Sequence, residues 1–376
     1  MTKIITLLLS FITFFSINAQ KSFNISGKLS GFEENASVKI IKNNITLDSC
    51  ILKDGNFLLK GTLENAPSSV VLFINNGEKY KYSELFIDNE SITINAKIDD
   101  FKWDVKTKDS KYDDLRYTYF QDIKDLSNQR EKFETEIFTK RDNGKWNDSL
   151  QVAYWNGKEP FGKIILIDKK IEEVNKNFIT ENINSYYGLY LLEANKSVLS
   201  KEFITTTFKK LKPELRKTAF ANSINSYLNN PDLKIGDQFY DFMAFDQLGR
   251  KVKFSNYFNK KYILLDFSTP YCGFCIQSIP ILNKLIKENS DQLEIVTFYV
   301  DKDPKGFQKL NQKHPDWLTI WDKAGRLGGI YSKYKVDGTP VFYLFSPDGK
   351  LVEKFDGFDE ELGASVSKKI KNPRQD

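Results

Sequence analysis

The first part of the chain alternates apolar and polar residues with the two-residue period of β-strands. Strand-like segments lie at residues 37–41, 44–47, 49–52, 57–59, 70–74 and 92–96. In the last of these, Ile92 and Ile94 alternate with polar neighbours, as in a half-buried strand. The pair Asp54-Gly55 favours the positive φ angles of a tight turn, which predicts a hairpin between 49–52 and 57–59. The pattern indicates an N-terminal all-β domain over residues 20–105.

Residues 106–230 change to the period of amphipathic helices. Apolar residues recur at helical spacing at Tyr112, Leu115, Tyr119, Ile123 and Leu126, and again at Ile164, Ile167, Ile171, Val174 and Phe178. Between them, residues 141–160 are polar and have the low periodicity of a loop. Aromatic stripes at helical spacing are usually core positions, so this region is interpreted as a helical linker domain.

The last region, residues 231–376, alternates β and α patterns. A buried strand is predicted at 262–267 and another at 293–300, with a helix starting near Ile276. Helices are expected near 306–312 and 323–333, and a closing helix at 359–370. Residues 339–345 and 350–354 flank a strong turn signal and form a hairpin. The chain is therefore predicted to be multidomain, ending in an α/β fold with a mixed sheet.

The candidate chemistry of the chain lies at Cys272 and Cys275, between the strand at 262–267 and the following helix. Cys272 is expected at the helix N-terminus, where unpaired N–H groups and the helix dipole favour a thiolate. A thiolate is the nucleophile in disulfide exchange. Cys275, one turn further, can attack the resulting mixed disulfide and release it. The pair therefore indicates a redox site.

Residues around the pair strengthen this interpretation. An acid, Asp266, lies six before Cys272, Tyr271 immediately precedes it, and Pro280 lies five after Cys275. Thr339-Pro340 precedes the hairpin. Together these features resemble the thioredoxin superfamily, in its TlpA/ResA-like branch of thiol–disulfide oxidoreductases. The N-terminal region resembles a small β domain of unknown function that often precedes thioredoxin domains in bacterial envelope proteins.

The resemblance implies a role for each motif residue. Cys272 attacks the substrate disulfide, Cys275 resolves it, and the two form the redox disulfide. Asp266 exchanges a proton with the resolving cysteine. Pro340 is expected to be cis, and Thr339 to present its backbone to an extended substrate segment. Tyr271 is expected to contact the substrate.

Several features depart from the family pattern, and Asp266 is the thioredoxin-type acid at a place where the TlpA/ResA-like branch often has asparagine. Tyr271 replaces the usual tryptophan, and Ser278 stands where the TlpA/ResA-like branch commonly has glutamate. The strand at 293–300 has no lysine, so an acid–lysine pair with Asp266 is absent there. A role in cytochrome maturation is therefore not carried over from that branch.

The N-terminus predicts export. Lys3 precedes an apolar run over residues 4–15, and Ala19 ends the segment, so residues 1–19 are interpreted as a signal peptide cleaved before Gln20. Export would place the protein in the periplasm or cell envelope, where disulfides form and persist. The expected partners are protein thiol or disulfide substrates and an upstream membrane electron donor.

Composition excludes several functions. With 55 basic and 50 acidic residues the net charge is +5 and there is no long basic run, so no nucleic-acid partner is predicted. No cofactor is expected. A zinc site would need four ligands, whereas the cysteine pair, Cys50 and the single histidine, His314, are far apart in sequence. His314 lies in a polar stretch and is predicted to be solvated.

Some alternatives stay open. Cys50 is interpreted as a small packed strand residue. The alternative is a functional third thiol that captures Cys272 or a partner. Thr269, three before Cys272, is spaced as in peroxiredoxins, but Leu265 stands where those enzymes have proline. A non-enzymatic docking module is the third possibility. The preferred prediction is an exported thiol–disulfide oxidoreductase, a reductant or isomerase.

Overall fold

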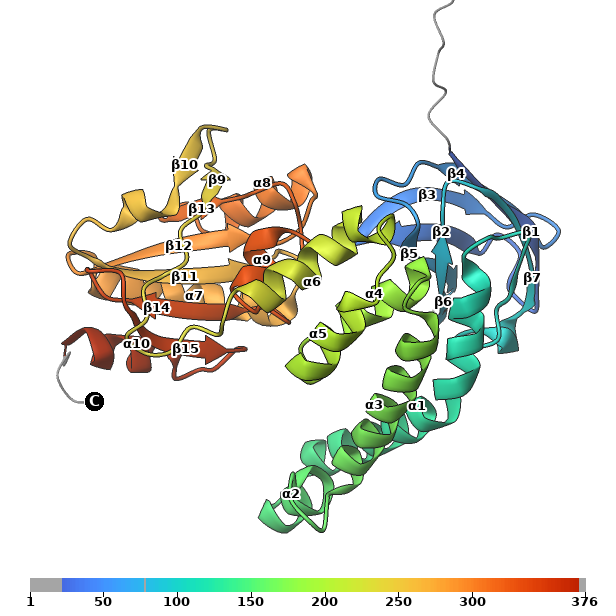
Figure 1. Ribbon diagram of the computed structural model, residues 1–376, viewed down its shortest axis with the longest axis horizontal. Helices are drawn as coiled ribbons and strands as arrows, with labels where there is room; N and C mark the ends of the chain where they lie inside the picture. The colour runs from blue at the N-terminus through green and yellow to red at the C-terminus, as the bar shows by residue number, and fades with distance from the viewer. Residues whose placement is uncertain (1–21, 78, 372–376) are drawn as a thin grey trace, which may run out of the picture.

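The computed structural model describes residues 22–77 and 79–371, in three consecutive regions (Figure 1). The predicted signal peptide lies outside the described residues. The strands of the first region are β1 (Phe23–Ser30), β2 (Ser37–Lys42), β3 (Ile45–Ile51), β4 (Asn56–Gly61), β5 (Ser68–Asn76), β6 (Lys79–Ile87), β7 (Ser91–Lys97) and β8 (Thr107–Lys108). The helices of the second are α1 (Asp113–Asp142), α2 (Asp148–Trp155), α3 (Lys163–Asn182), α4 (Tyr186–Ala194), α5 (Lys201–Lys209) and α6 (Ala219–Asn229).

The third region alternates strands and helices. Its strands are β9 (Met243–Phe245), β10 (Lys251–Lys253), β11 (Tyr262–Ser268), β12 (Leu293–Tyr299), β13 (Leu318–Ile320), β14 (Val341–Phe345) and β15 (Leu351–Asp356). Its helices are α7 (Gly273–Glu288), α8 (Pro304–Lys313), α9 (Gly329–Lys333) and α10 (Leu362–Lys371). The predicted fold class, an all-β region, a helical middle and a C-terminal α/β region, is confirmed.

The β region has two four-stranded sheets, in the orders β4-β1-β7-β8 and β3-β2-β5-β6. Apolar residues of both sheets form one core, in which Ile92 and Ile94 are buried as their alternation predicted. The turn at Asp54-Gly55 has positive φ at both residues. The predicted hairpin is nevertheless wrong beyond this turn, because β3 pairs with β2 and β4 pairs with β1.

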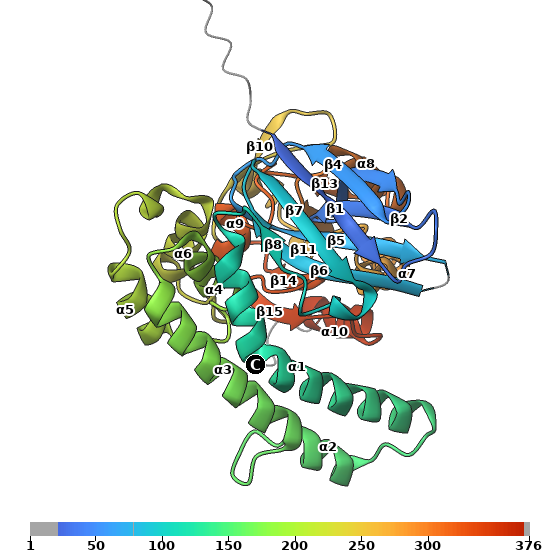
Figure 2. The ribbon, with the colours of Figure 1, turned by 90° about the vertical axis from the view of Figure 1, so that its right-hand side faces the viewer.

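The helical region is built on α1 and α3, which run side by side (Figures 1 and 2). Its core contains the predicted aromatic stripe, including Tyr119 and Phe178, whose rings pack edge to face at 5.2 Å. The predicted loop at 141–160 is wrong in part, because it contains α2. The Asn147 side chain caps that helix by accepting a hydrogen bond from the Leu150 N–H.

The C-terminal region is organised on one mixed sheet of order β13-β12-β11-β14-β15. The first three strands are parallel, and β14 and β15 form the predicted antiparallel hairpin. Apolar clusters cover both faces, one of them built with α7 and α10. The helix predicted at 323–333 is shorter, since only α9 forms there, and β13 was not predicted.

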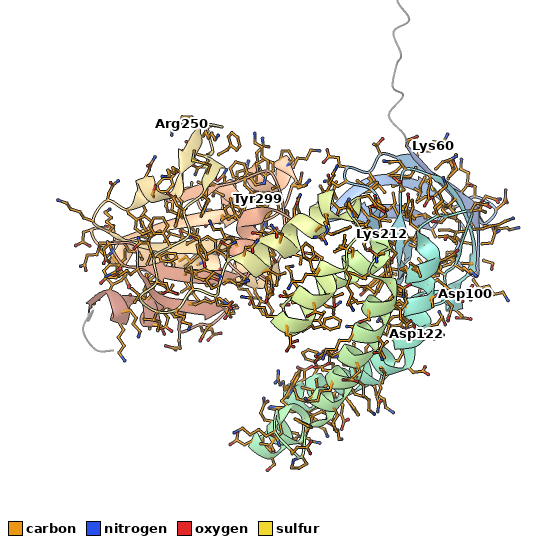
Figure 3. All side chains as sticks on the ribbon, in the orientation of Figure 1. Lys60, Asp100, Asp122, Lys212, Arg250 and Tyr299 are labelled. Carbon is orange, nitrogen blue, oxygen red and sulfur yellow. The ribbon has the colours of Figure 1, made fainter. Side chains whose placement is uncertain are left out.

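The helical region is attached to the C-terminal region through α6 and α9. The hydroxyls of Ser223 and Ser332 are hydrogen-bonded at 2.6 Å, and Ser226 donates to the carbonyl of Gly329. The Lys335 ammonium donates to the carbonyl of Tyr227. The last residue of β12, Tyr299, is labelled in Figure 3 at the end of the sheet nearer to this junction.

None of the helices in the part of the chain that the structure describes has the length and hydropathy of a membrane span.

Candidate active site

Cys272 is the N-cap residue of α7, at the end of the loop that leaves β11. Its Sγ accepts a hydrogen bond from the backbone N–H of Cys275 at 3.4 Å. Cys272 is partly exposed, whereas Cys275, one turn into the helix, is fully buried. The predicted arrangement of an accessible thiol at a helix start and a buried thiol one turn away is therefore present, with both cysteines as free thiols.

The surroundings separate the acidities of the two thiols. Burial raises the pKa of Cys272, but several hydrogen bonds together outweigh this effect, those from the Cys275 N–H and thiol first among them, and the net pKa is below the ordinary value. For Cys275, burial raises the pKa to about 12, and the nearby Asp266 carboxylate adds to the rise. Cys272 is thus the thiol that ionises first.

Asp266 lies in β11, on the face of the sheet that carries Leu264 and is covered by α7. It is 2% exposed, and burial raises the pKa of its carboxyl to about 7, against the opposing hydrogen bond from Thr297. Its Oδ2 accepts that bond at 2.9 Å, while Oδ1 has no partner among the described residues. A buried carboxyl with a pKa near neutrality can take up and return a proton.

The peptide bond between Thr339 and Pro340 is cis, as predicted. The carbonyl oxygen of Thr339 lies 3.2 Å from the Sγ of Cys272. A cleft of about 370 Å³ adjoins this loop and is lined by Asp337, Thr339, Pro340 and Gly357, among others. The structure thus brings Thr339 and Pro340 against the exposed cysteine.

Two aromatic rings flank Cys272. Tyr271 is 38% exposed, and its hydroxyl donates a hydrogen bond to Asp303, the N-cap residue of α8. Phe274, between the cysteines, is 59% exposed and stacks with Phe358 at 6.1 Å. These rings give the surface around Cys272 an apolar character that a polypeptide segment could cover.

The sequence did not reveal a polar network behind the cysteine loop. Thr269 donates a hydrogen bond to Asp301 at 2.6 Å, and Arg326 donates to the other oxygen of the same carboxylate at 2.8 Å. The indole N–H of Trp321 donates to the Asp301 carbonyl. This network joins the loop before Cys272 to the ends of β12 and β13. Its members are far apart in sequence, so it can be identified only from the contacts in the folded protein.

The remaining sequence candidates lie away from the cysteine pair. The prediction that His314 is solvated is wrong, because it is 1% exposed and stacks on Trp317 with ring centroids 4.4 Å apart. Burial lowers its pKa to about 4, so the ring is neutral near pH 7. Cys50 packs against the core of the β region, and burial raises the pKa of its thiol. No group of three or more possible metal ligands occurs among residues 22–77 and 79–371.

Two family models match the chain. Residues 23–115 match "Domain of unknown function (DUF4369)", and residues 259–351 match the model described as "Thioredoxin-like". The second match contains Asp266, both cysteines and the cis-proline loop. Residues 259–351 form a thioredoxin-like domain. The predicted resemblance, including the preceding β domain of unknown function, is confirmed.

Known relatives match mainly this thioredoxin-like domain. The chain is 27% identical over 136 residues to the thiol-disulfide oxidoreductase ResA of Bacillus cereus, covering 35% of this chain and 75% of that protein. It is 28% identical over 97 residues to the chloroplastic thioredoxin Y2 of Arabidopsis thaliana, covering 26% of this chain and 43% of that protein. The chain thus spans less than half the length of this plant relative.

Among solved structures, a thiol:disulfide interchange protein from Bacteroides sp. is similar, with 24% identity and a TM-score of 0.34. The match covers 38% of this chain and 94% of that one.

Proposed function

We propose that this protein is a thiol–disulfide oxidoreductase that exchanges disulfides with protein substrates through Cys272 and Cys275. The observation that carries the proposal is the arrangement of an exposed thiol capping α7, a buried thiol one turn away and the buried acid Asp266 close to the second thiol. Each element of this arrangement has a defined task in exchange chemistry.

In the reducing direction, the Cys272 thiolate attacks one sulfur of the substrate disulfide, and the other sulfur leaves as a thiolate. A mixed disulfide through Cys272 results. The Cys275 thiol then gives its proton to Asp266, and its sulfur attacks the Sγ of Cys272. The substrate's second thiolate leaves with the electron pair, so the substrate is reduced and the Cys272–Cys275 disulfide forms.

The surface around Cys272 supports a polypeptide as substrate. An extended segment beside Thr339 would pair with its backbone, and the rings of Tyr271 and Phe274 would contact its side chains. Thr339, Pro340 and Tyr271 are therefore proposed as substrate-binding residues. The cleft next to Pro340 offers room for the segment to continue.

The peroxidase alternative receives less support. A peroxidatic threonine would direct its hydroxyl toward the reacting cysteine, but the hydroxyl proton of Thr269 is directed to Asp301. A docking module without activity would have no need for a buried resolving thiol beside an unpartnered carboxyl oxygen. The arrangement thus favours disulfide exchange over both alternatives.

The cellular setting is part of the proposal. The N-terminal sequence supports export to the periplasm or envelope, and a reductant there would depend on an upstream membrane electron donor. Intact-mass measurement of the exported protein should give an N-terminus at Gln20. Retention of the full chain in the cytoplasm would contradict this part of the proposal alone.

Insulin reduction tests the activity directly. The reduced protein should reduce insulin disulfides, and Cys272→Ser should abolish the reaction, while peroxide consumption under matched conditions stays at background. Equilibration with a glutathione series gives the reduction potential of the pair. A potential near those of strong oxidants would overturn the reductant or isomerase direction, and absence of insulin reduction by the folded protein would overturn the activity.

A further inference from the structure

A hydrogen-bond chain runs from Trp317 through Thr297 to Asp266. The parallel register of β11 and β12 places Thr297 opposite Asp266, at the strand position where the sequence has no lysine. The indole Nε1–H of Trp317 donates to Thr297 Oγ1 at 2.9 Å, and Thr297 Oγ1 lies 2.9 Å from Asp266 Oδ2. All three side chains are in the buried layer that α7 covers.

The donor and acceptor chemistry of these groups fixes the direction of both hydrogen bonds. An indole N–H can only donate, and a threonine hydroxyl has a single proton. Because Trp317 occupies an acceptor site on Thr297, the hydroxyl proton is free to point at Asp266 Oδ2. The carboxyl group is thereby held by one oxygen, and Oδ1 is left without a partner among the described residues.

We propose that Thr297 and Trp317 are positioning residues that orient Asp266 for proton exchange with Cys275 through Oδ1. The inference rests on the proposed exchange activity for its catalytic meaning. In the resolving step, the Cys275 S–H bond breaks, its proton goes to Oδ1, and the sulfur attacks Cys272. The proton held on Oδ1 is later available to the thiolate when the pair is reduced again.

Among the groups that face Asp266, the hydrogen-bonded pair Thr297 and Trp317 provides the main polar contact. From α7 the titratable neighbour is Cys275, and β14 contributes the apolar Phe342. His314, at the end of α8, stacks on Trp317, and its ring is neutral near pH 7 because burial lowers its pKa. The hydrogen bond from Thr297 is the contact that lowers the pKa of Asp266 against the effect of burial. Its loss should raise that pKa further.

The test compares three threonine variants in the full-length protein. Thr297→Val removes the hydroxyl at constant shape, Thr297→Ser retains it, and Thr319→Val is the matched control. Thr319 is also buried, lies opposite Thr297 on β13, and its hydroxyl has no partner among the described residues. Trp317→Phe removes the indole N–H while keeping an aromatic ring against His314.

Two readouts are measured across pH. One is the rate at which Cys275 resolves a mixed disulfide on Cys272; the other is equilibrium unfolding by denaturant, which reports the titration of Asp266 without requiring activity. In Thr297→Val, the pH profile of the resolving step and the upper end of the pH-dependent decline in stability should both move to higher pH by about one unit, because only the folded-state pKa of Asp266 changes. Thr297→Ser and Thr319→Val should keep the wild-type profiles, and Trp317→Phe should shift in the direction of Thr297→Val.

The outcomes distinguish this inference from the proposed activity. A merely structural role would lower stability equally at all pH values and leave the profile of the resolving step in place, which would overturn the inference. The same holds if Thr319→Val shifts the profiles as much, or if Thr297→Val still shifts the unfolding profile in an Asp266→Asn background. If the unfolding profile shifts as expected but no variant or wild-type protein reduces insulin, the activity fails and the orientation of Asp266 stands.

Discussion

The Sγ atom of Cys272 lies 3.2 Å from the carbonyl oxygen of Thr339, the residue before the cis-proline. A protonated thiol can donate to this carbonyl, whereas a thiolate would be repelled by it. The hydrogen bond from the Cys275 N–H acts in the opposite sense, because it stabilises the thiolate. Cys272 is therefore placed between a contact that suits its thiol form and one that suits its thiolate form.

The lowered pKa of Cys272 predicts selective alkylation. The thiolate persists to lower pH than in an ordinary cysteine, whereas burial raises the pKa of the Cys50 thiol. In the reduced protein near pH 7, iodoacetamide should modify Cys272 on the order of tenfold faster than Cys50, as read by peptide mass spectrometry. In denaturant the two rates should converge. Equal rates in the folded protein would remove the basis for a nucleophilic Cys272.

The unequal exposure of the two cysteines predicts which one holds a substrate. Cys275→Ala should accumulate a mixed disulfide with a protein substrate through Cys272, because the buried resolving thiol is gone. Cys272→Ser should accumulate none, since Cys275 is inaccessible. Non-reducing electrophoresis followed by peptide mapping locates the bond. Cys50→Ala serves as the control and should leave turnover unchanged; adducts on Cys50 would support its alternative role as a third active thiol.

Much of the site could be predicted from sequence because its residues are local to one strand and one helix. Asp266, Cys272 and Cys275 lie within ten positions, and strand-then-helix periodicity places them together. Thr297 and Trp317 lie far from these residues in sequence and reach Asp266 only because of how β11, β12 and β13 are aligned in the sheet. Neither a threonine nor a tryptophan at these positions indicates that contact in the sequence.

The errors in the fold have similar causes. Asp54-Gly55 specifies a turn, but a turn does not determine which sheet each flanking strand joins, and β3 and β4 diverge. His314 has polar neighbours in sequence, and its burial follows from stacking on Trp317, which packs against the sheet. Helix α2 is short, and its period was hidden in a polar stretch. Tertiary packing decided which sheets β3 and β4 join and the burial of His314.

Buried Asp266 predicts a specific dependence of stability on pH. An aspartate has an ordinary pKa of 3.8, and burial raises the pKa of Asp266 to about 7 in the folded protein, so the folded state keeps the proton to higher pH than the unfolded chain. The stability that Asp266 contributes is fully present below the lower pKa and falls by about 1.4 kcal/mol per pH unit until the upper one. Asp266→Asn should lack this decline, so its stability relative to wild type should rise between those pH values and be constant above them. Parallel profiles of wild type and variant in urea unfolding would show that Asp266 does not titrate in this window.

The same variant predicts a kinetic defect. Without the carboxyl group, Cys275 has no buried acceptor for its proton, and its raised pKa keeps it in the thiol form. Release of the mixed disulfide should slow by roughly 10²-fold or more near neutral pH. Alkylation of Cys272 should change far less, which serves as the internal control. Stopped-flow measurement of both steps separates them, and an unchanged release rate would exclude a proton-transfer role for Asp266.

The β and helical regions meet at a junction that lies far in sequence from the cysteines. Asp113 and Arg116 form an ion pair in which both side chains are fully buried. Asp113 also accepts hydrogen bonds from the Phe86 N–H at 2.7 Å and from Thr107 at 2.9 Å, which links α1 to β6 and β8. Removing one partner of a buried pair leaves the other charge uncompensated.

Asp113→Ala should therefore lower the free energy of unfolding by about 3–5 kcal/mol, measured by denaturant unfolding of the full chain. The matched control is Asp114→Ala at the exposed neighbouring position of the same helix turn, where the loss should stay below about 1 kcal/mol. Under conditions where both variants are folded, the rate of insulin reduction should equal that of wild type. A cost for Asp113→Ala no larger than the control would mean that Arg116 finds another partner, and a changed exchange rate would show that this junction acts on the thioredoxin-like domain.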